Sequence, residues 1–165
     1  MNMNKLVEWA ISQLGVVESP PHSNNGEPMK RYALSGEQPL AWCARFVRTG
    51  MKLAGNPLPG NQWSIASVAN LKKELEKVGA WHPVDEIGFE PAPGDLVLLG
   101  SQASSDVGVK GHHVGIVEKF ESGIVHSIDG NWSDKVARVQ RNPKNPKDHI
   151  WGYGRWPQSS VQESK

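Results

Sequence analysis

Residues Pro39–Gly55 read PLAWCARFVRTGMKLAG and contain the only cysteine of the chain, Cys43. Apolar residues follow the cysteine at helical spacings, which predicts an amphipathic helix that ends at Gly55. Cys43 is expected in the first turn of this helix, where unpaired backbone N–H groups and the helix dipole favour a thiolate. That position suits a nucleophile. Free cysteine is also among the most buried residue types, so the pattern equally fits a small inert core residue.

Length and charge limit the classes of protein to which the chain belongs. Its 165 residues suffice for one domain with a core, and a single cysteine forms no internal disulfide. A net charge of +1 gives no strong attraction to nucleic acid, and no apolar run has the length of a membrane span. The N-terminus lacks the pattern of a signal peptide. We expect one monomeric domain over residues 1–165, synthesised in the cytoplasm, with no nucleic-acid partner and no membrane insertion.

Helical patterns occupy the first half of the chain and strand patterns the second. Besides the cysteine helix, helices are expected over residues 6–14, 27–34 and 64–78, the last capped by Ser64 or Ser67. From residue 91 onward, short apolar and β-branched runs alternate with turn residues and predict strands. This order indicates an α+β fold, with N-terminal helices packed on a C-terminal antiparallel sheet. The polar stretch SQASSDVGVKG, residues 101–111, is expected to be a loop that borders a site.

The turn FESGI, residues 120–124, fixes which side chains of the two best strands share a face. We expect a three-residue loop over residues 121–123 with Gly123 in the left-handed conformation, which pairs Phe120 with Ile124. A slip of one residue would move every side chain to the other face, so the identity of the functional histidine depends on this register.

This register gathers three polar side chains on one face of the hairpin: His113, Asp129 and Asn131. Gly115 falls opposite Asp129 and leaves room for contact. His112 and His126 fall on the other face, among apolar residues. A cysteine at a helix start and a strand histidine oriented by a carboxylate or amide are the parts of a thiol hydrolase.

Five blocks of the sequence together resemble the CHAP domain family, the cysteine, histidine-dependent amidohydrolases/peptidases. They are LAWCARFV, PAPGDLVLL, GHHVGIV, SIDGNWSDKV and IWGYGRW. The resemblance covers roughly residues 6–156. It implies a papain-like α+β fold and cleavage of an amide bond in bacterial peptidoglycan, as in phage endolysins and bacterial wall hydrolases. The protein would then act on the cell wall after release or delivery.

By motif position the resemblance implies that Cys43 is the nucleophile, His113 the base, Asp129 the residue that orients the base, and Asn131 the following polar residue. It implies no cofactor. Some family members place several acidic residues before the cysteine to bind calcium, whereas residues 22–42 hold only two glutamates and no aspartate. No bound metal is therefore expected. The resemblance leaves two possibilities for the cleaved bond, a peptide bond cut by an endopeptidase or the bond cut by an N-acetylmuramoyl-L-alanine amidase.

Two alternatives compete with a thiol hydrolase. A metal-dependent hydrolase would draw its ligands from His112, His113, His126 and Asp129, but the hairpin divides them between two faces. A non-catalytic wall-binding module would use loop tryptophans such as Trp63 and the basic residues of the segment 135–147, with Cys43 buried and inert. A solvated loop is the simpler interpretation of that basic segment.

Overall fold

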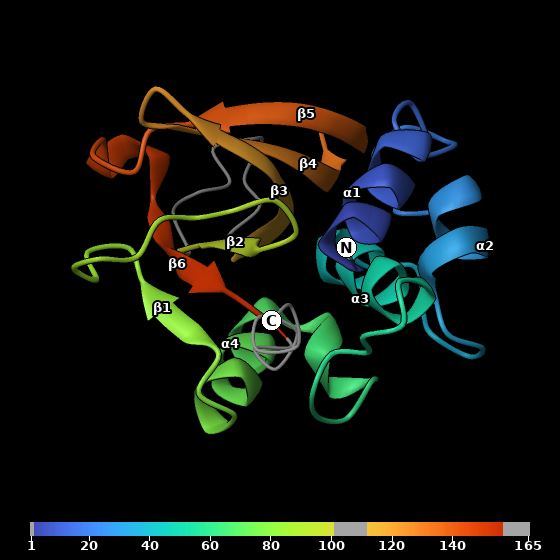
Figure 1. Ribbon diagram of the computed structural model, residues 1–165. Coiled ribbons are helices and arrows are strands. Elements are labelled where there is room, and N and C mark those ends of the chain that lie inside the picture. Colours follow the sequence, from blue (N-terminus) through green and yellow to red (C-terminus); the bar gives the residue numbers. More distant parts are fainter. Residues whose placement is uncertain (1, 101–111, 157–165) are drawn as a thin grey trace.

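The computed structural model describes residues 2–100 and 112–156, so the stretch 101–111, expected to border a site, lies outside the described residues. The helices come first in the chain (Figure 1). They are α1 (Asn2–Ser12), α2 (Glu27–Tyr32), α3 (Cys43–Leu53), the 3-10 helix η1 (Ser64–Ala66) and α4 (Val68–Lys77). No helix in the described ranges has the length and apolar character needed to cross a membrane.

Six strands follow and form one antiparallel sheet in the order β1-β6-β2-β3-β4-β5. They are β1 (Trp81–Pro83), β2 (Leu96–Leu99), β3 (His113–Glu121), β4 (Ile124–Trp132), β5 (Lys135–Arg141) and β6 (Ile150–Gly154), with the 3-10 helix η2 (Pro146–Asp148) before β6. Figure 1 shows α1, α2 and α3 gathered on one side of the sheet and α4 beside β1. The expected α+β fold is confirmed. Strand β1 lies before residue 91 and was not expected, because three residues are too few to show an alternating pattern.

Helix α3 packs between α1 and the sheet, and two glycines permit the close approach. A Cβ added to Gly50 would lie 2.5 Å from the ring of Trp9 in α1, and a Cβ added to Gly130 in β4 would lie 2.6 Å from Cβ of Phe46. The helix ends just before Gly55, whose φ of 88° favours glycine. This packing places the N-terminus of α3 against the start of β3.

The single helix expected over residues 64–78 is divided at Ser67. Ser67 has an extended backbone, and its hydroxyl accepts a hydrogen bond from the Asn70 N–H at 3.3 Å. Of the two expected caps, Ser67 is therefore the N-cap of α4. The preceding residues form η1 instead of a first helical turn.

The turn between β3 and β4 differs from the expected three-residue loop. Glu121 pairs with Ile124, so the turn holds two residues, Ser122 and Gly123. Both have positive φ, 53° and 77°, as the favoured two-residue hairpin turns require, because their twist matches that of the strands.

A bulge in β3 then restores the expected register next to the site. The pairing shifts between Val117 and Lys119, and beyond the shift Ile116 pairs with Ile128 as the sequence predicted. The one-residue error at the turn and the one-residue bulge cancel each other. His113 and Asp129 therefore share a face even though the predicted turn was wrong.

The basic segment 135–147 begins as strand β5 and not as a solvated loop. The exposed Arg138 pairs with Glu118 of β3 at 3.0 Å, while Arg141 is buried, with 4% of its surface exposed. The loop interpretation was wrong for residues 135–141, since its β-branched residues pair with β4.

Candidate active site

Cys43 is the first residue of α3 and has 6% of its surface exposed. The preceding residue is held in place by two buried contacts. Trp42 Nε1 donates a hydrogen bond to Glu18 Oε2 at 2.8 Å, and the Trp42 ring stacks on Tyr32 with ring centroids 5.6 Å apart. Because these contacts fix the backbone where the helix begins, they also fix the direction in which the thiol points.

Burial opposes ionisation of Cys43, but its pKa is still lowered from the ordinary value. The charge and hydrogen bond of His113 outweigh burial, with further help from the backbone N–H groups of Val114 and Ala44. Burial likewise disfavours a charged His113, but Cys43 and Asp129 together raise its pKa to about 9. Each of the two groups therefore stabilises the charged form of the other.

The imidazole of His113 is oriented by Asp129. His113 Nε2 lies 2.8 Å from Asp129 Oδ2, which leaves Nδ1 as the ring nitrogen available to Cys43. Gly115, between them on the same face, has no side chain, and a Cβ there would collide with Asp129 Oδ1. Glycine at this position is thus a condition for the contact between histidine and aspartate.

Asp129 is in turn held by two residues that the sequence analysis did not assign to the site. Arg141 Nη2 donates to Asp129 Oδ2 at 2.7 Å, and the Ser127 hydroxyl donates to Oδ1 at 2.7 Å. Arg141 Nη1 also donates to Ser127 Oγ at 3.0 Å. Burial raises the pKa of Asp129, but Arg141 and then His113 overcome it and hold that pKa well below the usual range. Asp129 is therefore an ionised carboxylate that accepts from the histidine.

The ring of Trp132 lies close to both His113 and Arg141. Its ring centroid lies 5.4 Å from that of His113, and the guanidinium carbon of Arg141 lies 4.9 Å from the Trp132 ring. The cation–π contact with Trp132 helps to hold Arg141 in place.

The structure thus brings together Cys43, His113 and Asp129, and Asn131 follows them in an irregular part of β4. Asn131 takes a positive φ of 59° where the pairing of β4 and β5 shifts, and within the described chain it makes no hydrogen bond to His113 or Asp129. A residue in such an irregularity no longer follows the strict alternation of the strand, on which the expected placement of Asn131 on the shared face depended.

The other histidines lie apart from this group. His112 stacks on Trp151 with ring centroids 4.6 Å apart, and His126 pairs with Lys119 across the hairpin. Within residues 2–100 and 112–156, no three or more His, Cys, Asp or Glu side chains are grouped to hold a metal ion. The metal-hydrolase alternative therefore has no set of ligands among these residues.

Two solved structures share the fold. The crystal structure of Ly7917 matches with a TM-score of 0.55 and 13% identity, covering 93% of this chain and 62% of that one. The crystal structure of Ly7917 with the hydrolyzing product of MDP matches with a TM-score of 0.52 and 14% identity, covering 92% and 61%. At these identities the likeness concerns the fold alone, and the chain spans about three fifths of their length. No curated protein matches the sequence significantly.

The family comparison agrees with the resemblance seen in the sequence blocks. The CHAP domain model matches residues 35–131, more than half of the chain. The matched range includes Cys43, His113 and Asp129, and it ends before Arg141. The chain therefore belongs to the CHAP domain family, whose members are amidases and peptidases related to peptidoglycan.

Proposed function

We propose that this protein is a cysteine-dependent hydrolase that cleaves an amide bond of bacterial peptidoglycan. The observation that supports it best is the arrangement of Cys43 at the start of α3, its hydrogen-bond partner His113, and the buried Asp129, whose Oδ2 lies 2.8 Å from His113 Nε2. Nucleophile, base and orienting carboxylate are all present and in the order that acyl transfer needs.

In the proposed reaction the Cys43 thiolate attacks the amide carbonyl carbon, and a bond forms between Sγ and carbon. The oxyanion lies near the first backbone N–H groups of α3, including that of Cys43, which have no acceptor within the helix. The C–N bond then breaks, and His113 gives its proton to the leaving amine. Water, deprotonated by His113, then attacks the carbonyl carbon of the thioester. The C–S bond breaks, the acyl group leaves as a carboxylic acid, and the Cys43 thiolate and His113 imidazolium are restored.

Asp129 has a separate task. It accepts the Nε2–H of His113 and keeps Nδ1 directed at the thiol, while its charge stabilises the imidazolium. Arg141 and Ser127 hold the carboxylate and act through it, so both are positioning residues.

Two findings support peptidoglycan as the substrate. The family consists of peptidoglycan-related amidases and peptidases, and one structure of similar fold contains the hydrolyzing product of MDP, a peptidoglycan fragment. We favour a bond within the peptide stem over the bond between muramic acid and the first alanine. The protein would be made in the cytoplasm and would reach the wall after release or delivery.

Digestion of purified sacculi tests this function. A thiol hydrolase releases new amines and no new reducing sugar ends, and mass spectrometry of the fragments identifies the bond. Shortened muropeptides mean an endopeptidase, whereas bare glycan chains with intact released peptides mean an amidase. New reducing ends would contradict the mechanism. Binding to sacculi without any release of amines, with equal binding by Cys43→Ala, would favour the wall-binding module.

A further inference from the structure

An open pocket of about 560 Å³ lies beside the segment that leads to Cys43. Its wall includes Leu40 and Ala41, which precede Cys43 by three and two residues, and it continues to Trp63 before η1 and to Ser67 and Asn70 of α4. Leu40 and Trp63 are large apolar side chains that are 60% and 54% exposed. The lining is mainly apolar, and the volume lies in the range of sites for small molecules.

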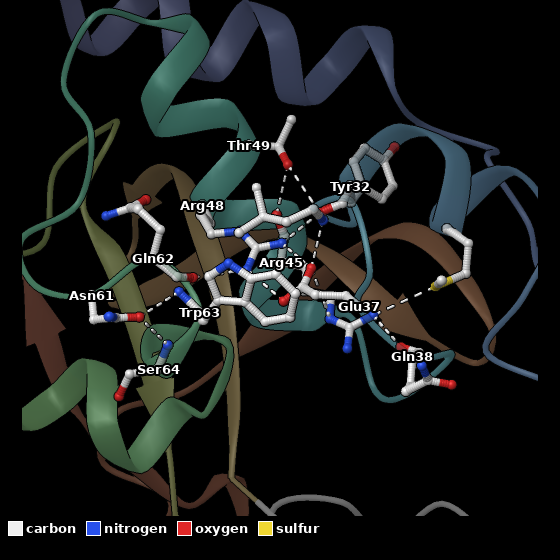
Figure 2. Close-up of polar contacts among 12 residues, drawn as sticks. Tyr32, Glu37, Gln38, Arg45, Arg48, Thr49, Asn61, Gln62, Trp63 and Ser64 are labelled. Atoms are coloured by element: carbon white, nitrogen blue, oxygen red, sulfur yellow. Dashed lines mark hydrogen bonds and ion pairs between the residues drawn. The ribbon is translucent and has the colours of Figure 1, made fainter.

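Two charged side chains line this pocket, Glu37 and Arg45, and Arg45 is the cation. Its side chain is 5% exposed, and its Nη1 donates to the Gln38 carbonyl at 2.8 Å and to Met29 Sδ at 3.5 Å. Within the described chain neither Nε nor Nη2 donates a hydrogen bond, and Nε is fully enclosed whereas Nη2 is not. Figure 2 shows the Nη1 contacts as dashed lines and the Arg45 guanidinium among Trp63, Glu37 and Gln38.

The nearest carboxylate does not satisfy Arg45, because another arginine occupies it. Arg48 binds Glu37 with both nitrogens, Nη2 to Oε1 at 2.6 Å and Nη1 to Oε2 at 2.8 Å. Arg45 Nε is 3.7 Å from Glu37 Oε1, beyond hydrogen-bond distance. Burial lowers the pKa of Arg45, and of its neighbours Glu37 opposes this effect while Arg48 adds to it. Two guanidinium groups thus share one carboxylate, which leaves one positive charge in excess next to the pocket.

We propose that this pocket is a substrate subsite that binds a carboxylate of the peptidoglycan stem peptide through Arg45, with Trp63 and Leu40 packing against the adjoining aliphatic atoms. A buried guanidinium with a free N–H group gains most from an anion, and Nη2, the nitrogen that is not fully enclosed, is the one that would donate to a carboxylate in the pocket. Because the neighbouring surface is apolar, a carboxylate on an aliphatic chain fits the pocket better than a phosphate-like polyanion. This inference rests on the proposed function, because it names the part of that substrate which the pocket recognises.

Ser67 allows a test that keeps the fold intact. Aspartate is as good an N-cap as serine, so Ser67→Asp retains the start of α4 while placing a negative charge in the pocket. Ser67→Asn keeps the cap and the size without the charge and measures the steric part. Lys73→Gln makes the same change in net charge on an exposed position of α4 outside the pocket and serves as control.

Binding is measured in full-length Cys43→Ala protein, so that turnover does not interfere, by calorimetry with synthetic stem peptides. Ser67→Asp should weaken binding roughly fivefold relative to Ser67→Asn, the upper range for a partly exposed charge interaction. The affinity of the Lys73→Gln variant should stay within about twofold of that of the Cys43→Ala protein. Peptides with either the isoglutamyl α-carboxylate or the terminal carboxylate converted to an amide identify the bound group, because the effect of Ser67→Asp disappears for that peptide alone.

Arg45→Gln should abolish most of the binding. Its melting temperature, compared with that of the Cys43→Ala protein, checks that the variant is still folded around the Glu37–Arg48 pair. The inference is overturned if Ser67→Asp binds as tightly as Ser67→Asn, if the doubly amidated peptide binds as well as the free acid, or if no stem peptide binds. Release of amines from sacculi by the unmodified protein decides the proposed hydrolase function separately, so the two ideas can fail independently.

Discussion

Arg141 donates from Nη2 to Oδ2 of Asp129 at 2.7 Å, and the same oxygen accepts the hydrogen bond of His113. Both members of the pair are buried, with 4% and 0% of their surface exposed. One carboxylate oxygen therefore links the base of the proposed site to a cation on a neighbouring strand. The charge that orients His113 depends on a residue outside the matched family range.

Replacing Arg141 should damage both stability and activity. Arg141→Met leaves Asp129 as a buried charge without its main partner, which costs about 3–5 kcal/mol of unfolding free energy. Turnover should fall by on the order of tenfold to a hundredfold, part of what a positioned base supplies. Arg138→Met is the matched control, because Arg138 lies on the same strand but its ion pair with Glu118 is exposed and contributes at most about 1 kcal/mol. Equal losses in the two variants would contradict a positioning role for Arg141.

Asp129→Asn should retain more activity than Asp129→Ala. An amide oxygen still accepts the Nε2–H of His113, whereas alanine leaves the ring free to rotate. Neither variant provides a charge for Arg141, so both should melt below the unmodified protein. Steady-state rates on a defined muropeptide rank the two, and a faster alanine variant would show that Asp129 does not orient the base.

Acid should remove the stability advantage conferred by Asp129. Its pKa is lowered in the folded state, so the stabilisation is fully present above the pKa of an unfolded aspartate, about 4, and is lost as the pH falls towards the folded value. The difference in melting temperature between the unmodified protein and Asp129→Asn should therefore shrink below pH ~4. A difference that stays constant down to pH ~3 would mean that Asp129 has the same pKa in the folded and the unfolded state, so that Arg141 and His113 do not lower it.

The sequence predicted those parts of the site that depend on residues close together in the chain, and it predicted less well those that depend on distant residues. The helix after Cys43 is set by local periodicity and by Gly55, so it was predictable from neighbouring residues. His113 and Asp129 were correctly placed on the same face although the turn was wrong, because the bulge between Val117 and Lys119 compensated for it. A bulge leaves little trace in the residues themselves, since it is decided by packing on both sides of the strand.

Arg141 was missed for a different reason. In the sequence it is one of several basic residues between positions 135 and 147, and nothing local separates it from the exposed Arg138. The available signal was the alternation of β5, which places the residue on the face of Asp129 once Asp129 is known to pair with Ala137. The partner of a buried charge is thus visible only after the strand pairing is known.

Of the adjacent histidines only His113 should be essential. His113→Ala removes the proton carrier and should lower turnover by at least about a hundredfold. His112→Ala removes a ring that stacks on Trp151, away from the thiol, and should leave most of the turnover. The comparison requires similar melting temperatures for the two variants. Equal damage to turnover would show that the assignment of the base is wrong.

Cys43 should react as an activated thiol at pH values where ordinary thiols are inert. Its pKa is lowered, so the thiolate persists below the usual value of about 8.5 and disappears only as the pH falls through the lowered pKa. The rate of iodoacetamide labelling, followed by mass spectrometry, should stay high at mildly acidic pH. The labelled protein should no longer release amines from sacculi, whereas treatment with EDTA should leave this activity intact.

The second limb of the pH profile belongs to His113. Because Cys43 and Asp129 raise its pKa to about 9, turnover should fall as the pH rises through that value and the imidazolium loses the proton needed by the leaving amine. In His113→Ala the labelling midpoint of Cys43 should move upward, since burial raises the thiol pKa and the opposing charge is gone. An unchanged midpoint would show that His113 does not activate the thiol, and labelling only after denaturation would identify Cys43 as an inert core residue.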